Sequence, residues 1–313
     1  MHLSRARTTP RSRSLLAAVL TTVALVATAC SGADDPAADQ TDGTGAAASG
    51  EPQAIISLSP TTTEMLYAVG AGDRVVAVDE RSNYPANAPV TDLSGYTPNL
   101  EAILGYQPDL VVATDDTGDI VSGLERSGVE VLLLPAARTL DDTYTQIEQV
   151  GAATGTVGEA AELVSRMRGE IDEIVASVPR RETPLTYFHE LDDTYYTVTD
   201  DTYIGEVYSL LGLTSIATGE DAYPQLSEEL ILEADPDLVM LADGQCCGIT
   251  PEVVAERPGW GELAAVRQDR VFVVDEDLAS RWGPRVVDFM REVAGIISTL
   301  TVNDSQPERE PAS

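Results

Sequence analysis

Arginine, tyrosine and tryptophan residues gather in a few predicted loops that follow the ends of predicted strands. With one glutamate among them, they are Arg81, Tyr84, Tyr96, Glu190, Tyr223, Arg281, Trp282 and Arg285. A planar guanidinium group suits an anionic partner, and aromatic faces suit a flat organic surface. These residue types predict a binding site for an anionic molecule with a flat organic shell.

Simpler structural roles compete with this interpretation. Tyr84 precedes Pro85 and could pack in a turn, and Arg285 could pair with any carboxylate of this acidic chain. Trp282 is the strongest candidate, because it lies between Arg281 and Gly283 in a loop without core periodicity. Trp260, in contrast, follows a Pro-Gly pair at a predicted helix start, where packing is the simpler role.

The elements that must position these loops occur twice. Residues 101–115 (EAILGYQPDLVVATD) and 229–243 (ELILEADPDLVMLAD) align without a gap. Each copy predicts a helix that begins at an acid, a Pro-Asp break, and a buried strand. A second pair, residues 56–70 and 196–212, predicts a strand, a polar turn and a helix that ends at glycine. Two recurring βα units predict an α/β fold of two similar lobes. A ligand cleft is expected between the lobes, beyond the carboxyl ends of the strands.

An amphipathic stretch, residues 157–178, separates the two copies. Its apolar residues keep helical spacing, so it predicts one long connecting helix. We therefore expect an N-terminal lobe over 53–156 and a C-terminal lobe over 179–302, each with its own core. Residues 303–313 are expected to form a flexible tail.

The first 29 residues have the features of an export signal. Four arginines precede an apolar run that ends in small residues before Cys30. The segment resembles a bacterial lipoprotein signal with Cys30 as the lipidated residue, although Ala27 stands where such signals usually have leucine. Ordinary secretion with a free thiol is the alternative. Residues 30–52 are small and acidic and predict a disordered tether. The protein is then expected outside the cytoplasm, anchored by lipid to the cell membrane.

Charge excludes one class of partner. The formal net charge is −33, and it falls to −37 without residues 1–29, which hold four arginines and no acid. Nucleic acid is not an expected partner, because phosphate binding needs a basic face. Genome composition or a salt-tolerant surface is the preferred explanation of the acidity.

Two adjacent cysteines, Cys246 and Cys247, leave two alternatives open. Export favours a vicinal disulfide, whereas two buried thiols are also consistent with the sequence. Metal binding by this pair is not expected, because no histidine is nearby to complete a site. His189 is expected to be a core or loop residue rather than a ligand.

Four segments together resemble one family over about residues 53–300: ISLSPTTTEMLYAVGAGDRVVAV, NLEAILGYQPDLVVA, YPQLSEELILEADPDLVML and RWGPRVVDFM. The chain is similar to the substrate-binding proteins of bacterial ABC importers for ferric siderophores, haem and cobalamin. The resemblance implies two Rossmann-like lobes joined by one long helix, a ligand in the cleft, and small domain motion. It also implies docking onto a membrane permease that works with an ATPase.

In that family, one glutamate of each lobe contacts permease arginines, and these residues match Glu101 and Glu229. Both also lie in the first turn of a predicted helix, behind Asn99 and Ser227. Negative charge there stabilises a helix by about 0.3–1 kcal/mol, so both roles can hold together.

The resemblance implies a bound chelate, most simply a ferric siderophore, and no cofactor or directly bound metal. Cobalamin is the first alternative, because its binding proteins line the cleft with tryptophan where this chain has Tyr96 and Tyr223. Haem ranks lower, because the loop with Tyr96 differs in its spacing from the docking glutamate.

An enzyme is the alternative from a different class. A secreted glycoside hydrolase would use two acids, but the sequence singles out no pair among its many carboxylates. It also shows no nucleophile elbow, phosphate loop or histidine-bearing metal motif. We expect no enzyme. A purely structural lipoprotein is the third interpretation, and the duplicated pattern argues against it.

Overall fold

The computed structural model describes residues 50–304. The predicted export signal, Cys30, most of the predicted tether and residues 305–313 lie outside this range.

The N-terminal lobe is built on a parallel sheet with the strand order β2-β1-β3-β4. Its strands are β1 (Ile55–Ser57), β2 (Val75–Val78), β3 (Leu110–Ala113) and β4 (Glu130–Leu133). Its helices are α1 (Pro60–Ala68), η1 (Gly72–Arg74), α2 (Leu100–Gly105), η2 (Thr117–Asp119), α3 (Ile120–Arg126) and α4 (Leu140–Thr154). Alternate residues of β3 face opposite sides of the sheet. Leu110 and Val112 pack in one core with α1 and α4, whereas Val111 and Ala113 pack in another with α2 and α3.

The C-terminal lobe repeats this topology with the strand order β6-β5-β7-β8, again all parallel. Its strands are β5 (Leu185–Glu190), β6 (Leu213–Ser215), β7 (Leu238–Leu241) and β8 (Val271–Val273). Its helices are α6 (Tyr203–Leu210), α7 (Glu228–Ala234), α8 (Gly244–Cys247), α9 (Pro251–Ala255), η3 (Trp260–Glu262), α10 (Ala264–Arg267), α11 (Glu276–Ser280) and α12 (Val286–Asp304). The identical strand order confirms the predicted pair of similar α/β lobes.

The repeated Pro-Asp pair does the same work in each lobe. The Asp109 carboxylate accepts hydrogen bonds from the backbone N–H of Gln53 at 2.8 Å and of Ala54 at 3.0 Å, at the start of β1. Asp237 accepts one from the backbone N–H of Thr186 at 2.8 Å, near the start of β5. In both lobes the aspartate that precedes the third strand thus fixes the start of the neighbouring first strand.

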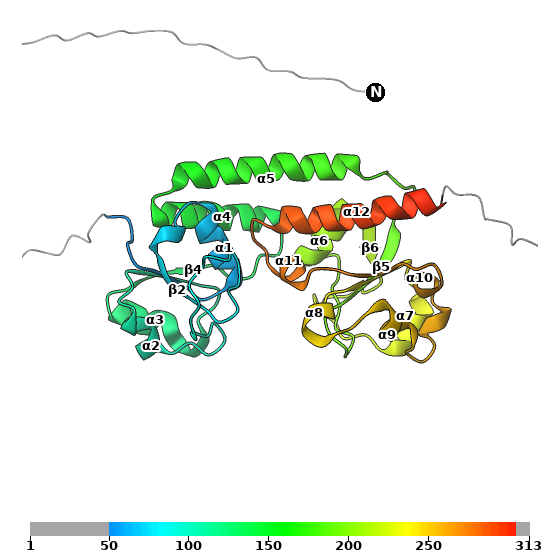
Figure 1. Ribbon diagram of the computed structural model, residues 1–313, viewed down its shortest axis with the longest axis horizontal. Helices are drawn as coiled ribbons and strands as arrows, with labels where there is room; N and C mark the ends of the chain where they lie inside the picture. Colours follow the sequence, from blue (N-terminus) through cyan, green and yellow to red (C-terminus); the bar gives the residue numbers. More distant parts are fainter. Residues whose placement is uncertain (1–49, 305–313) are drawn as a thin grey trace, which may run out of the picture. The chain divides into compact units, whose positions relative to one another are not determined.

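One helix connects the lobes, as predicted: α5 (Val157–Ser177). It packs against α4 of the first lobe and α12 of the second, and Figure 1 shows it running along both. The buried cluster beneath it is continuous, because it includes Leu110 of β3, Leu163 of α5 and Leu238 of β7. The expectation of a separate core for each lobe is therefore only half right. Each lobe has its own outer core, but the inner core is shared.

One local prediction differs from the structure. Residues 196–198 form no strand of the sheet, because the Thr197 N–H donates to the loop carbonyl of Pro224 at 3.0 Å, and β5 takes the central position instead. The short helix α11 directly precedes Arg281 and Trp282, and the last helix, α12, begins at Val286.

Within residues 50–304, no helix is long and apolar enough to cross a membrane.

Candidate functional site

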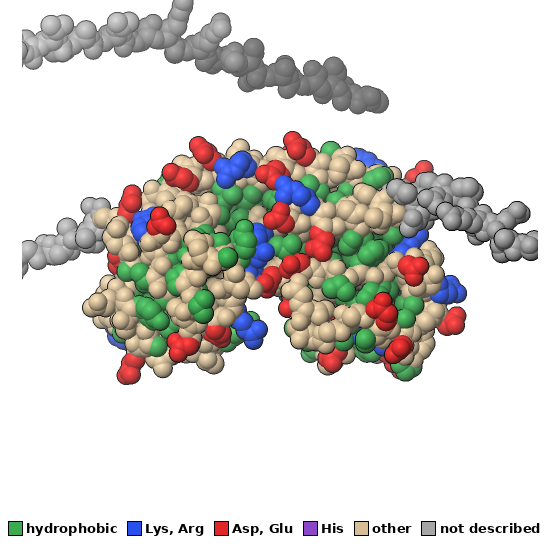
Figure 2. Space-filling view, viewed as in Figure 1, with side chains coloured by type: hydrophobic (Ala, Val, Ile, Leu, Met, Phe, Trp, Pro, Cys, Tyr) green, Lys and Arg blue, Asp and Glu red, His purple; other side chains and the backbone are tan. Residues whose placement is uncertain are grey.

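A cavity of about 760 Å³ lies where the two sheets present the carboxyl ends of their strands. Its wall includes Ser59 after β1 and Arg81 after β2 from the first lobe, with Leu191 after β5 and Ala242 after β7 from the second. Figure 2 shows the molecule hollowed between the lobes, on the side away from α5. The predicted cleft is therefore present at the place where ligands of such sheets bind.

Four of the eight predicted contact residues line this cavity: Arg81, Tyr96, Arg281 and Trp282. Tyr96 is 76% exposed, so its ring is open to a ligand. The other four, Tyr84, Glu190, Tyr223 and Arg285, are not part of its wall. The structure thus brings together half of the predicted set, and the ligand contacts themselves stay predictions.

Arg281 lines the cavity, but its charge is already paired. One of its terminal nitrogens donates to Glu64 Oε1 at 2.8 Å and to Asn83 Oδ1 at 2.9 Å. The other donates to Asp277 Oδ1 at 2.5 Å. The residue is only 6% exposed. Arg281 therefore holds the wall together, and little of its charge is left for a ligand.

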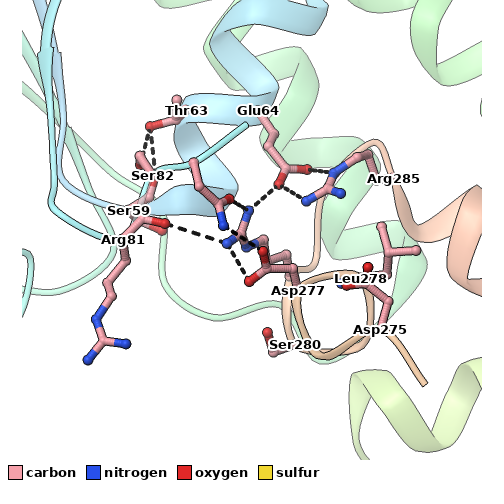
Figure 3. Close-up of polar contacts among 12 residues, drawn as sticks. Ser59, Thr63, Glu64, Arg81, Ser82, Asp275, Asp277, Leu278, Ser280 and Arg285 are labelled. Atoms are coloured by element: carbon pink, nitrogen blue, oxygen red, sulfur yellow. Dashed lines mark hydrogen bonds and ion pairs between the residues drawn. The ribbon is translucent and has the colours of Figure 1, made fainter. Parts of the chain in front are cut away.

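Arg285 is directed to the same carboxylate. Its guanidinium donates to Glu64 Oε2 at 2.9 Å and to Glu64 Oε1 at 2.6 Å (Figure 3). Tyr84 covers the outer face of this guanidinium, with the Arg285 Cζ atom 4.2 Å from the ring centroid. Arg285 and Tyr84 therefore complete an ion-pair network between the lobes and do not reach the cavity.

Glu64 is the residue of this network that the sequence prediction missed. It is 2% exposed, and it lies on α1 of the first lobe, whereas both arginines lie between α11 and α12 of the second. A signal was present, because the helices of residues 56–70 and 196–212 each carry a glutamate six positions before the closing glycine. The equivalent residue of the second copy, Glu206, accepts a hydrogen bond from the Leu140 backbone N–H at 2.6 Å. This N–H opens α4 of the first lobe, where helix donors lack internal partners.

Glu190 is not placed as predicted. It is fully buried, and its carboxylate accepts two hydrogen bonds of 2.6 Å from Arg257. Asp243, fully buried beside it, has no hydrogen-bond partner for either carboxyl oxygen among the described residues. Burial, and then the charge of Glu190, raise the pKa of Asp243 to about 7. A buried arginine needs a carboxylate partner, and Glu190 provides it for Arg257. Glu190 is therefore buried in the second lobe and does not line the cavity.

His189 was expected in the core or a loop, and the structure buries it completely. Its Nδ1 atom is 2.8 Å from the Tyr208 hydroxyl, and burial lowers its pKa to about 3. The ring therefore stays neutral where it borders the cavity.

The two tryptophans differ as predicted in their surroundings. Trp282 borders the cavity, and its indole N–H donates to Gln146 Oε1 at 3.0 Å, which fixes the ring. Trp260 is fully buried in the outer core of the second lobe, edge-on to Phe188.

The vicinal cysteines form a disulfide in α8, with their Cα atoms 3.8 Å apart. Both residues are exposed, so the alternative of two buried thiols is wrong. Cys246 also lines the cavity.

Comparison with known proteins decides the family. A family described as periplasmic binding protein matches residues 55–278. The chain belongs to this family.

Individual relatives narrow the class. An ABC transporter substrate-binding lipoprotein of Bacillus subtilis, named YvrC and described as uncharacterized, is 31% identical over 78% of this chain and 79% of its own. The structure of the vitamin B12 binding protein of Vibrio cholerae is 28% identical, with a TM-score of 0.66 over 82% of this chain and 99% of that one. A possible iron-binding protein of Staphylococcus epidermidis is 27% identical, with a TM-score of 0.71 over 79% of this chain and 99% of that one.

The periplasmic binding protein assignment gives the general function. The chain is an ABC-transporter substrate-binding protein of the cobalamin, haem and siderophore family, and such proteins deliver small molecules to a permease with its ATPase. Members of the family are solute-binding proteins, not enzymes.

The two predicted docking residues are placed symmetrically in this periplasmic binding protein. Glu101 and Glu229 are both exposed in the first turns of α2 and α7. The caps of these helices are Asn99 and Ser227, whose side chains accept from Ala102 N at 3.0 Å and Leu230 N at 3.3 Å. A hydrogen bond from its own backbone N–H, and then one from the Ser227 side chain, lower the pKa of the exposed Glu229, so this residue takes part in the helix start as well.

Proposed function

We propose that this protein captures a ferric siderophore outside the cytoplasm and delivers it to a membrane permease. The observation that carries the proposal is the cavity of about 760 Å³ walled by both lobes, within the range of about 300–1,000 Å³ typical of small-molecule sites. Tyr96 and Trp282 offer aromatic surface to the organic shell of a chelate, and Arg81 offers hydrogen-bond donors. A compact ferric chelate brings its own metal ligands, so it requires only such shape and polarity from the protein.

Cobalamin is the second candidate. The similarity to a vitamin B12 binding protein supports it, and so does the exposed ring of Tyr96, which could lie against a corrin face. Cobalamin is much larger than a compact ferric chelate, so more of it would protrude from a cavity of this volume. We therefore place the siderophore first.

Binding to purified protein tests the proposal. The full chain would be expressed and purified from cells, and then titrated with ferric siderophores, cyanocobalamin and haem while tryptophan fluorescence is recorded. We expect saturable quenching by at least one ferric siderophore and weaker binding of its iron-free form. Tyr96→Ala should weaken binding, whereas Tyr106→Ala, an exposed tyrosine outside the cavity, should not. Tight binding of cyanocobalamin alone would replace the first candidate with the second, and binding of none of these ligands would refute both.

Delivery to the permease is the second part of the proposal, and Glu101 and Glu229 are its proposed contacts. Changing both to Ala should leave the ligand dissociation constant nearly unchanged and abolish uptake of radioactive iron from the chelate. The matched control replaces Glu125 and Glu233, exposed acids on α3 and α7, with Ala. If the Glu101 and Glu229 double variant transports as well as this control, the two residues have no docking role.

A further inference from the structure

The charges around the cavity do not match an anionic cargo, although the sequence suggested one. Its charged lining residues are the arginines Arg81 and Arg281 and the acids Asp79, Asp115, Glu276 and Asp277. Arg285, the third predicted arginine, contributes nothing to the wall. The arginines that suggested an anionic cargo differ in how far their charge is free.

Arg281 is neutralised within the protein. It shares the Glu64 carboxylate with Arg285, and it pairs with Asp277 as well. Arg281 and Arg285 thus pair with the two carboxylates of Glu64 and Asp277, and the charges of these four residues balance at this part of the wall. Only the acids outside this network, Asp79, Asp115 and Glu276, remain to be compared with Arg81.

Arg81 is the single unpaired cation among the described lining residues. Its side chain extends away from the network, and no interaction is drawn to its guanidinium in Figure 3. None of the hydrogen bonds or ion pairs of the described part of the chain involves that group; only its backbone takes part, through Asp79 and Arg281. One unpaired cation at the wall is therefore opposed by three acidic side chains.

The three acids are held in place by hydrogen bonds from backbone N–H groups. Asp79 accepts from the backbone N–H of Arg81 at 3.2 Å. Asp115 accepts from the backbone N–H of Thr117 at 2.9 Å, and Glu276 accepts from that of Cys246 at 3.1 Å. Burial raises the pKa of Asp79, so the surplus of acids over Arg81 rests mainly on Asp115 and Glu276 at the wall. The net charge of the whole chain, −33, has the same sign and acts at longer range.

We propose that the cavity selects a ferric chelate of zero or positive net charge and discriminates against chelates that carry free carboxylates. This inference rests on the proposed function, because it specifies the charge of the same cargo. A cationic chelate is attracted to the surplus acids, and a neutral chelate is not repelled by them. Arg81 remains free to donate hydrogen bonds to carbonyl or hydroxamate oxygens on the rim of the chelate. An anionic chelate must approach the same acids with a single arginine to compensate them.

The test uses chelates that differ only in the charge of one pendant group. Ferrioxamine B carries a terminal ammonium, its N-acetyl derivative is neutral there, and its N-succinyl derivative carries a carboxylate. The full chain would be titrated with each by calorimetry at low and high salt. We expect affinity to fall in the order ammonium, acetyl, succinyl, by about tenfold across the series at low salt and by less at high salt, where charges are screened.

Variants assign the effect to the cavity. Asp115→Asn and Glu276→Gln keep an acceptor oxygen, and each should reduce the difference in affinity between the ammonium and succinyl forms. Arg81→Gln should increase that difference in affinity. Glu125→Gln on α3 removes one exposed acid outside the cavity and should leave the difference unchanged. An equal effect of Glu125→Gln would assign the preference to the overall charge of the chain and overturn the role of the cavity acids.

The outcomes separate this inference from the proposed function. If the succinyl form binds as tightly as the ammonium form, the charge selection is refuted while the siderophore function stands. If no ferrioxamine binds but cobalamin does, the same comparison is made between cyanocobalamin and its monocarboxylate, where weaker binding of the carboxylate supports the inference and equal binding refutes it. Binding of haem alone, with its two propionates, refutes the inference, and binding of no chelate refutes the proposed function with it.

Discussion

Glu64 and Glu206 occupy the same position in the two copies of the repeat, and each binds the opposite lobe. Glu64 on α1 accepts hydrogen bonds from Arg281 and Arg285 of the second lobe. Glu206 on α6 accepts one from the Leu140 N–H of the first lobe. The duplicated unit thus provides two reciprocal links between the lobes, and the link through Glu64 contains buried charge.

Glu64→Ala should destabilise the protein by about 3–5 kcal/mol, because it leaves Arg281 and Arg285 without their buried carboxylate. The free energy of unfolding would be measured by urea denaturation. Asp141→Ala is the control, since it breaks an exposed ion pair with Arg168 and should cost less than about 1 kcal/mol. Equal losses in the two variants would contradict a structural role for the Glu64 network.

Trp282→Phe should remove most of the fluorescence change on ligand binding, because Trp282 borders the cavity and Trp260 does not. Loss of an aromatic contact worth about 0.5–1.5 kcal/mol should also weaken binding by up to about tenfold. The measurement is a fluorescence titration of the wild type, Trp282→Phe and Trp260→Phe with a ferric siderophore. Retention of both the quench and the affinity in Trp282→Phe would place the ligand elsewhere.

Asp243 should make the protein less stable as the pH rises. Burial and the neighbouring Glu190 raise its pKa to about 7 in the folded state, from about 3.9 in an unfolded chain. Between these values the folded state keeps a proton that the unfolded state has released, so the free energy of unfolding falls as the pH rises from about 4 to about 7. Asp243→Asn should abolish this slope and stabilise the protein by up to roughly 4 kcal/mol near pH 8.

The measurement for Asp243 is the difference in urea unfolding between the variant and the wild type at several pH values. Taking the difference cancels the opposite contribution of His189, whose lowered pKa costs stability as the pH falls below about 6.5. Asp193→Asn, an exposed aspartate in the same lobe, is the control and should leave the slope unchanged. A slope that persists in Asp243→Asn would assign the pH dependence to other groups.

Cys30→Ala should move the protein from the membrane fraction to the soluble fraction or the medium. The prediction follows from the apolar run and the small residues that precede Cys30. Fractionation of the host and immunodetection of the full chain would measure it, with Cys247→Ser as a cysteine control. A variant that stays bound to the membrane would show that the anchor is not a lipid on Cys30.

Sequence predicted the duplicated architecture because its signals are local. The Pro108-Asp109 and Pro236-Asp237 pairs mark the same turn in both lobes, and the residues they hold lie one strand away in each sheet. The connecting helix was equally predictable, since its apolar spacing depends only on its own residues. Its predicted and observed starts are the same, and its predicted end, residue 178, lies one residue beyond the observed end at Ser177.

The misplaced elements depend on partners that sequence spacing does not reveal. Tyr196 to Val198 have strand-forming residue types, but the Thr197 N–H donates to the loop carbonyl of Pro224 and the Tyr196 carbonyl accepts from the Leu191 N–H, so the segment does not join the sheet ladder. Likewise, Glu190 is the last residue of β5, where a cleft residue is expected, but it forms a buried ion pair with Arg257, 67 residues later.

The ligand contacts predicted for the arginines stay predictions, but the structure gives Arg281 and Arg285 an ion-pair partner that the sequence did not predict. Arg281 and Arg285 follow a strand end of the second lobe, which suggested ligand contacts. Their carboxylate partner, Glu64, precedes them by 217 and 221 residues. A pairing at that distance depends on how the lobes face each other, which the sequence pattern alone did not specify.

The shared inner core beneath α5 bears on how the permease recognises a loaded protein. Since Leu110 and Leu238 of the two lobes belong to one packed cluster, closing the cleft would disturb contacts in both sheets. Ligand capture should therefore follow a single bimolecular step, with an observed rate that rises linearly with ligand concentration and reaches no plateau. The separation between Glu101 and Glu229 would then be nearly the same in empty and loaded protein. If Glu101 and Glu229 are the permease contacts, the permease should distinguish the two states by the surface of the cargo exposed at the cleft mouth, and not by the distance between these two residues.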